Sequence, residues 1–270
     1  MIYEKVKLND TAWLEIYAAD EIKGFTRKAI LIIPGGGYNN ICSDREGESV
    51  AMAFMPYGFN AFVLHYSVGE GHVFPQQLIE ASMAMKYIRD NTDRYNISSD
   101  DVFALGFSAG GHLAACLGTM WDSNIISDNV NVCNEYNKPK GVVLLYPVIE
   151  GGKEYSHNES FYNLFGTSEL TEDEYNSSNI INYISEKTPP TFIMHSSNDE
   201  LVNVKNSLML ADKFAENNIK FEMHIYYDAP HGVALANKLT WIDNPKYDNN
   251  SIAKWVECAV MWIEQVSNEL

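Results

Sequence analysis

The sequence predicts one doubly wound α/β domain, residues 1–270, with a mostly parallel sheet and helices on both faces. Two observations indicate this class. Short β-rich runs alternate with longer segments of helical periodicity along the whole chain. Several of the runs, such as 29–33 and 142–145, are continuously apolar, which is typical of parallel strands buried on both faces. No internal repeat or low-complexity linker divides the chain.

Seven strands are expected along the chain. Segment 12–18 alternates apolar and polar side chains, which predicts an edge or antiparallel strand. The other six expected strands, in chain order, are residues 28–33, 60–66, 102–107, 141–146, 191–195 and 220–227.

Four helices are expected between and after these strands. They are residues 77–95, 110–120, 204–217 and 251–267. Small residues in the second helix predict close packing against the sheet. Ser251 is expected to cap the start of the last helix, and Asn217 the end of the third.

Segment 148–187 interrupts the alternation of strands and helices. It is rich in Glu, Ser, Asn and Tyr, and short helices are expected near 160–165 and 171–176. A polar insertion of this length after a core strand is either a cover over a site or surface decoration. We expect a lid-like insertion.

The strongest chemical signal is Gly106-Phe107-Ser108-Ala109-Gly110, between a predicted strand and a helix of small residues. This is the G-x-S-x-G pattern in the context that it requires. A nucleophilic serine on such a sharp turn needs glycine-sized neighbours two residues away on either side. The alternative is a glycine-rich turn without chemistry.

A second signal is the glycine run of segment 34–38, Pro-Gly-Gly-Gly-Tyr, directly after an apolar strand. Consecutive glycines let backbone N–H groups face a developing oxyanion. Gly36, Gly37 and Ala109 are the candidate donors. A phosphate-binding loop is the alternative, but the run lacks the Gly-Lys-Ser/Thr ending of a P-loop.

A catalytic serine needs a base and an orienting carboxylate. His231 follows strand 220–227 in a loop, and Asp199 follows strand 191–195, so both are expected at the carboxyl edge of the sheet. Glu200 is the competing carboxylate. We expect structural roles for His112, on the helix behind the serine, and for His195, which ends a buried strand.

The chain carries 36 acidic and 19 basic side chains, a net charge of −17. This excess argues against nucleic-acid binding and an anionic membrane surface, and favours a neutral substrate.

Apolar stretches are shorter than the ~20 residues of a membrane span, and no signal-peptide pattern begins the chain, so a cytoplasmic protein is expected. Four dispersed cysteines indicate reduced thiols and neither a disulfide scaffold nor a zinc site. No cofactor is expected. A homo-oligomer is possible.

These motifs carry a family resemblance. The chain resembles the α/β-hydrolase esterases related to acetylxylan and feruloyl esterases. Related lipase-like families have His-Gly-Gly-Gly at the glycine run, whereas this chain has Pro34 in place of the histidine. This departure points to the polysaccharide-esterase branch. The similar segments are 32–38, 46–48, 60–66, 106–114, the turn around Asp199, and 230–232.

The resemblance implies an α/β-hydrolase fold with Ser108 as nucleophile, His231 as general base and Asp199 as its orienter. It also implies the glycine run as oxyanion hole, and no metal. The expected substrate is a small-molecule or oligosaccharide ester such as an acetylated xylo-oligosaccharide. Tyr38 and Tyr146 flank the active-edge loops and are the expected substrate contacts. A prolyl-oligopeptidase-like peptidase and a non-catalytic binding protein are the alternatives.

Overall fold

A computed structural model describes residues 1–132, 135–152 and 154–269. Its centre is an eight-stranded sheet of order β1-β2-β4-β3-β5-β6-β7-β8. The first two strands and β4 pair antiparallel, and all later neighbours pair parallel. The strands are β1 (Ile2–Lys7), β2 (Trp13–Ala18), β3 (Arg27–Ile33), β4 (Phe59–His65), β5 (Ile97–Phe107), β6 (Val142–Leu145), β7 (Thr191–Ser196) and β8 (Phe221–Tyr226).

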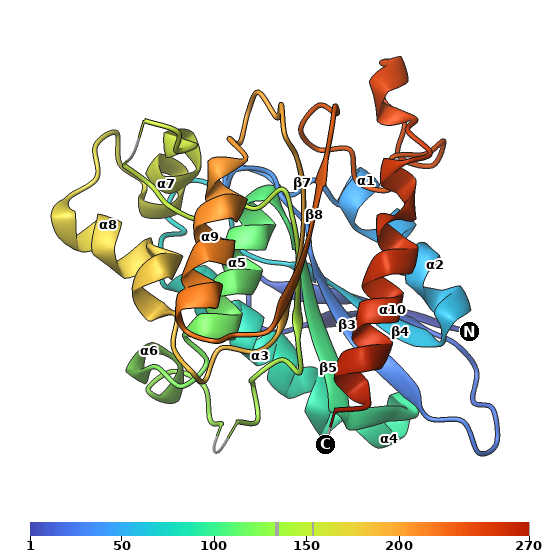
Figure 1. Ribbon diagram of the computed structural model, residues 1–270. Helices are drawn as coiled ribbons and strands as arrows, with labels where there is room; N and C mark the ends of the chain where they lie inside the picture. The colour runs from blue at the N-terminus through green and yellow to red at the C-terminus, as the bar shows by residue number, and fades with distance from the viewer. Residues whose placement is uncertain (133–134, 153, 270) are drawn as a thin grey trace.

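Helices cover both faces of the sheet (Figure 1). One face is covered by α3 (Gln76–Asp90), α5 (Ser108–Thr119) and α9 (Lys205–Glu216), and the other by α2 (Glu48–Phe54) and α10 (Trp255–Ser267). Strand β3 is fully apolar at its centre because its side chains pack into the hydrophobic cores on both faces of the sheet. Leu31 and Ile33 pack into the first core, whereas Ile30 and Ile32 pack into the second. The doubly wound α/β-hydrolase architecture expected from the sequence is confirmed.

The remaining elements are short. They are α1 (Ser43–Glu46), α4 (Thr92–Tyr95), α6 (Asn124–Ser127), α7 (Asn158–Phe165), α8 (Glu172–Ser178), and the 3-10 turns η1 (Met55–Tyr57), η2 (Ile180–Tyr183), η3 (Pro245–Tyr247) and η4 (Ile252–Lys254). The insertion 148–187 holds α7, α8 and η2 between β6 and β7. From α7, the Asn163 side-chain amide donates to the carbonyl of Gly37 (2.8 Å). The insertion therefore contacts the glycine run, and its action as a lid stays a prediction.

Every expected strand occurs, with ends shifted by a few residues, and β1 is an additional strand. Segment 77–95 was expected as one helix but forms α3 and α4, separated at Asn91. The expected cap at Ser251 is wrong. Helix α10 starts at Trp255 after η4, and the side-chain oxygen of Asn249, not of Ser251, accepts the backbone N–H groups of Ser251 and Ile252. Asn217 does occupy the C-cap of α9.

Two other sequence expectations concern cysteines and membrane spans. Cys42, Cys116 and Cys258 are free thiols, and Cys133 lies outside the described residues. Among the helices of the described ranges, none is both long and apolar enough to cross a bilayer.

Candidate active site

Ser108 stands on the turn where β5 ends and α5 begins, with a backbone φ of +53°. The two flanking glycines explain how so sharp a turn fits. A Cβ on Gly106 would lie 2.2 Å from the carbonyl oxygen of Gly110, and a Cβ on Gly110 would lie 2.2 Å from that of Ile33. The turn is thus wedged against the end of β3, and any larger side chain at either position would collide with backbone.

The structure brings Ser108, His231 and Asp199 into one chain of hydrogen bonds. The Oγ of Ser108 lies 2.8 Å from Nε2 of His231, and Nδ1 of His231 lies 2.7 Å from Oδ2 of Asp199. The hydroxyl of Tyr247 donates to the carbonyl of His231 (2.8 Å) and holds its loop. Each of the three residues lies just beyond the carboxyl end of a different strand, as the sequence predicts.

Asp199 is held from both sides. Its Oδ1 accepts the backbone N–H groups of Leu201 and Val202, each at 2.9 Å. Burial by itself would raise the pKa of Asp199, but the bonds from His195 and His231, the charge of His231 and the N–H of Val202 hold that pKa well below its usual range. The carboxylate therefore stays ionised, in a position from which it can orient the imidazole.

The glycine run lies directly beside the serine. A Cβ built on Gly35 would lie 3.0 Å from the Cβ of Ser108. Gly36 and Gly37 have φ values of +128° and +63°, a backbone path that favours glycine. Within the described ranges, no hydrogen bond occupies the N–H of either residue. The N–H of Ala109 lies in the first turn of α5, where backbone N–H groups lack intrahelical partners.

Tyr38 and Tyr146, the expected substrate contacts, are 1% and 2% exposed. The hydroxyl of Tyr38 lies 2.8 Å from Nδ1 of His112, and that of Tyr146 donates to Oε1 of Glu46 (2.9 Å). The structure therefore places both rings beneath the site, with their hydroxyls bound to protein groups, and does not bring them to its surface.

His112 and His195 are fully buried. His112 bridges Tyr38 and the carbonyl of Ser178, and His195 bridges Ser207 and the carbonyl of Val202. These are the structural roles expected from the sequence.

Two residues near the triad were not identified from the sequence. Glu46, 2% exposed, accepts the backbone N–H of Gly35 (2.8 Å). His157, at the start of α7, bonds Ser160 through Nδ1 (2.8 Å), and burial together with the charge of His231 lowers its pKa. No sequence motif surrounds His157, and Glu46 stood out only within the family resemblance.

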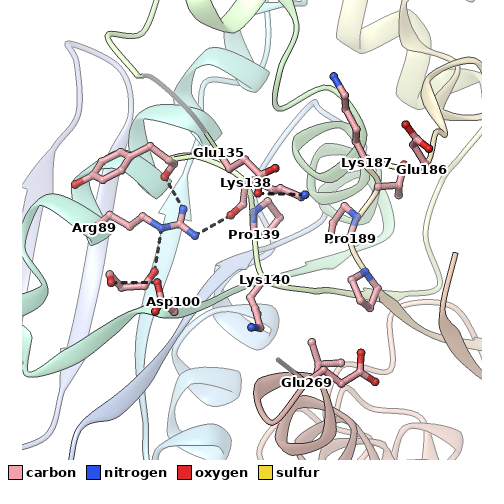
Figure 2. Close-up of a pocket in the computed structure, with 15 residues that line it drawn as sticks. Arg89, Asp100, Glu135, Lys138, Pro139, Lys140, Glu186, Lys187, Pro189 and Glu269 are labelled. Atoms are coloured by element: carbon pink, nitrogen blue, oxygen red, sulfur yellow. Dashed lines mark hydrogen bonds and ion pairs between the residues drawn. The ribbon is translucent and has the colours of Figure 1, made fainter.

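The described ranges contain no group of three or more His, Cys, Asp or Glu side chains arranged to hold a metal. A hollow of about 800 Å³ lies at the opposite edge of the sheet, lined by residues that precede β6 and β7 (Figure 2). Its Arg89 guanidinium donates to the carbonyls of Ser99, Tyr136 and Lys138. None of the three candidate triad residues lines this hollow, which is separate from the candidate active site.

The fold is that of the α/β hydrolases, with Ser108, His231 and Asp199 as a candidate triad at its strand ends, and comparison with known proteins gives the same fold class. The BD-FAE family matches residues 14–214, more than half of the chain. The protein belongs to this family.

Individual relatives are similar over most of this chain. The chain is 36% identical over 221 residues to endo-1,4-beta-xylanase B of Butyrivibrio fibrisolvens, covering 81% of this chain and 34% of that protein. It is 26% identical over 236 residues to the acetylxylan esterase of Xylanibacter ruminicola, covering 85% of this chain and 45% of that protein. The chain thus spans less than half the length of these two relatives.

A solved structure matches over nearly its whole length. The acetyl ester-xyloside bifunctional hydrolase of Caldicellulosiruptor lactoaceticus superimposes with a TM-score of 0.83 at 29% identity, covering 98% of this chain and 96% of that one. The candidate site therefore lies at the carboxyl edge of a sheet whose fold is shared with a hydrolase of known structure.

Proposed function

We propose that this protein is a serine carboxylic-ester hydrolase that removes acetyl groups from carbohydrate esters such as acetylated xylo-oligosaccharides. The observation that carries the proposal is the continuous hydrogen-bond chain Ser108–His231–Asp199 beside the glycine run. A serine bonded to an imidazole, which is itself bonded to a buried carboxylate, is the arrangement that activates a hydroxyl for acyl transfer.

The proposed reaction has two halves. His231 Nε2 takes the proton of Ser108 as Oγ attacks the ester carbonyl, and the N–H groups of Gly36, Gly37 and Ala109 hold the oxyanion. His231 then gives the proton to the leaving alcohol. A water molecule, deprotonated by His231, attacks the acyl-enzyme, and the imidazolium returns this proton to Ser108 Oγ as the acid leaves. Asp199 keeps the imidazole in the required tautomer throughout.

The substrate class is supported by relatives and by charge. An acetylxylan esterase and an acetyl ester-xyloside hydrolase are among the similar proteins. The net charge of −17 favours an ester that carries no negative charge. We propose a neutral small-molecule or oligosaccharide ester as the partner, and neither nucleic acid nor a membrane.

The test is hydrolysis of 4-nitrophenyl acetate and acetylated xylo-oligosaccharides by Ser108→Ala. We expect kcat/KM to fall by about 10⁴-fold or more. Ser127→Ala, at an exposed serine on α6, is the matched control and should leave the rate unchanged. Near-wild-type hydrolysis by Ser108→Ala would overturn the proposal. Preferential cleavage of an aminoacyl-p-nitroanilide by the wild type would indicate a peptidase instead.

A further inference from the structure

A second buried carboxylate lies next to the triad. Glu46 is the last residue of α1, which follows the glycine run in the chain, and only 2% of it is exposed. Its Oε2 accepts the backbone N–H of Gly35 (2.8 Å). One oxygen of this carboxylate is therefore bonded to the first glycine of the loop that presents the N–H groups of Gly36 and Gly37.

The other oxygen reaches the loop that carries His231. Oε1 of Glu46 accepts the hydroxyl of Tyr146 (2.9 Å), and that hydroxyl accepts the backbone N–H of Ala234 (3.0 Å). The ring of Tyr146 also lies against the imidazole of His231, with ring centroids 4.8 Å apart at 67°. Tyr146 thus contacts the His231 loop through both its hydroxyl and its ring.

Gly35 fills the space between Glu46 and the nucleophile. A Cβ at Gly35 would lie 3.0 Å from Oε2 of Glu46, 3.0 Å from the Cβ of Ser108 and 2.8 Å from the carbonyl oxygen of Phe107. Glu46, Phe107 and Ser108 therefore enclose this side of Gly35, and we expect a shift of the carboxylate to move the glycine run relative to Ser108.

The groups that bond or face Glu46 also act on the pKa of its carboxyl. Burial raises the pKa of Glu46, and the Gly35 N–H, the charges of Arg45 and His231 and the Tyr146 hydroxyl act in the opposite direction. A carboxylate removed from water is costly to the fold unless its partners are held in place.

We propose that Glu46 is a positioning residue for ester hydrolysis, which fixes the oxyanion loop and the His231 loop relative to Ser108. The inference rests on the proposed function. Because both loops act on the tetrahedral transition state, Glu46 should affect its stabilisation more than the binding of the ground-state ester.

The first test is Glu46→Gln, which keeps size but sets an amide N–H₂ against one of the two donors, Gly35 N–H or the Tyr146 hydroxyl. Misplacing reacting groups by about 1 Å can cost on the order of 10²-fold in rate. We expect kcat to fall about 10- to 100-fold, with KM for 4-nitrophenyl acetate changed less than about twofold. Affinity for a boronic acid that forms a tetrahedral adduct with Ser108 should fall in parallel with kcat/KM. Glu48→Gln, at an exposed carboxylate on α2, is the matched control.

Tyr146→Phe gives an independent measurement if Glu46→Gln does not fold. It removes only the hydroxyl and keeps the ring against His231, and we expect kcat to fall about 10-fold at unchanged KM. Because the two groups act in series, the double variant should be no slower than the slower single variant.

The inference is overturned if both single variants keep kcat within about twofold, or if KM rises while kcat is unchanged. These outcomes are separable from failure of the proposed function. Loss of activity in Ser108→Ala with full activity in both Glu46→Gln and Tyr146→Phe rejects the positioning role alone, whereas an active Ser108→Ala rejects the function itself.

Discussion

Ser108 adopts a left-handed backbone conformation, with φ of +53°. Such a conformation costs a non-glycine residue roughly 1–2 kcal/mol. It persists because β5, α5 and the end of β3 fix the turn from three sides, as the close approaches at Gly106 and Gly110 show. The consequence is that the Oγ stands clear of the strand and meets Nε2 of His231 at 2.8 Å.

Asp199 gives a pH-dependent prediction at this scale. Its pKa is lowered in the folded state despite burial, by bonds from His195 and His231, so the ionised form stabilises the fold above its unfolded pKa of about 3.9. That stabilisation is lost as pH falls below about 4 towards the folded pKa. We expect wild type and Asp199→Asn to differ more in free energy of unfolding at pH 6 than at pH 3, measured by urea denaturation. An equal difference at both values would contradict the lowered pKa.

At the scale of elements, helix α5 connects the site to the insertion. His112, on α5, bonds Tyr38 beneath the glycine run and the carbonyl of Ser178 at the end of α8. One buried imidazole thus joins three segments that lie far apart in the chain.

Burial lowers the pKa of His112 to about 4, whereas an unfolded histidine titrates near 6.5. The unfolded chain therefore binds a proton that the native imidazole does not, and the free energy of unfolding should fall as pH drops from about 6.5 to about 4. His112→Gln cannot bind this proton. We expect its stability to depend less steeply on pH, by up to about 1.4 kcal/mol per pH unit in that window. If the free energies of unfolding of wild type and His112→Gln, measured by urea denaturation, depended equally steeply on pH in this window, the lowered pKa of His112 would be refuted.

The contact between α5 and β3 gives a second prediction for the elements. Gly110→Ala would press a Cβ to 2.2 Å from the carbonyl oxygen of Ile33, and we expect a loss of about 3 kcal/mol in the free energy of unfolding. Gly24→Ala is the comparison, because nothing lies within 4 Å of its Cβ although its φ is +79°. That variant should lose only about 1 kcal/mol. Similar melting temperatures for both variants would show that the collision is relieved by movement.

The strands with apolar runs were predictable from the sequence. Two features were not, the existence of β1 and the end of α3, and each has a physical reason. Strand β1 pairs only with β2 at the edge of the sheet and is mostly exposed, so it has no hydrophobic pattern to identify it. Helix α3 ends at Asp90 although the helical pattern continues to residue 95. There Asn91 turns its side chain back onto the carbonyl of Tyr87 (2.8 Å), a local bond that competes with the helix.

For the whole molecule, the net charge of −17 gives a prediction about substrate choice. An ester that carries a carboxylate should have a lower kcat/KM than its neutral analogue, because the protein's field repels it. The gap should narrow as ionic strength rises from about 0.01 M to about 1 M, where the screening length falls from about 30 Å to about 3 Å. Matched neutral and anionic acetyl esters measure this directly, and a gap independent of salt would assign the preference to local contacts.

The candidate triad was predictable because each member lies in a short motif at the end of a strand. The roles proposed for Glu46 and Tyr146 were not predictable, because they depend on a contact between two residues that lie 100 positions apart in the sequence. Tyr146 was expected as a substrate contact because it flanks an active-edge loop, yet it is buried with a backbone φ of +37° and its ring lies against His231. The cytoplasmic location and a homo-oligomeric state remain predictions from the sequence.

The insertion between β6 and β7 has a consequence for how this fold diversifies. The two strands pair in parallel register, Val142 with Thr191 through Leu145 with Met194, so the 148–187 segment leaves β6 at the carboxyl edge of the sheet and enters β7 at the opposite edge. It is a crossover connection. Replacing it would exchange α7, with the amide that bonds the carbonyl of Gly37, and the backbone N–H of Val148, which donates to the carbonyl of Ser108 (3.1 Å). A change in this segment would therefore reach both the glycine run and the turn of Ser108, so its sequence and the geometry of the site should change together along a lineage of such proteins.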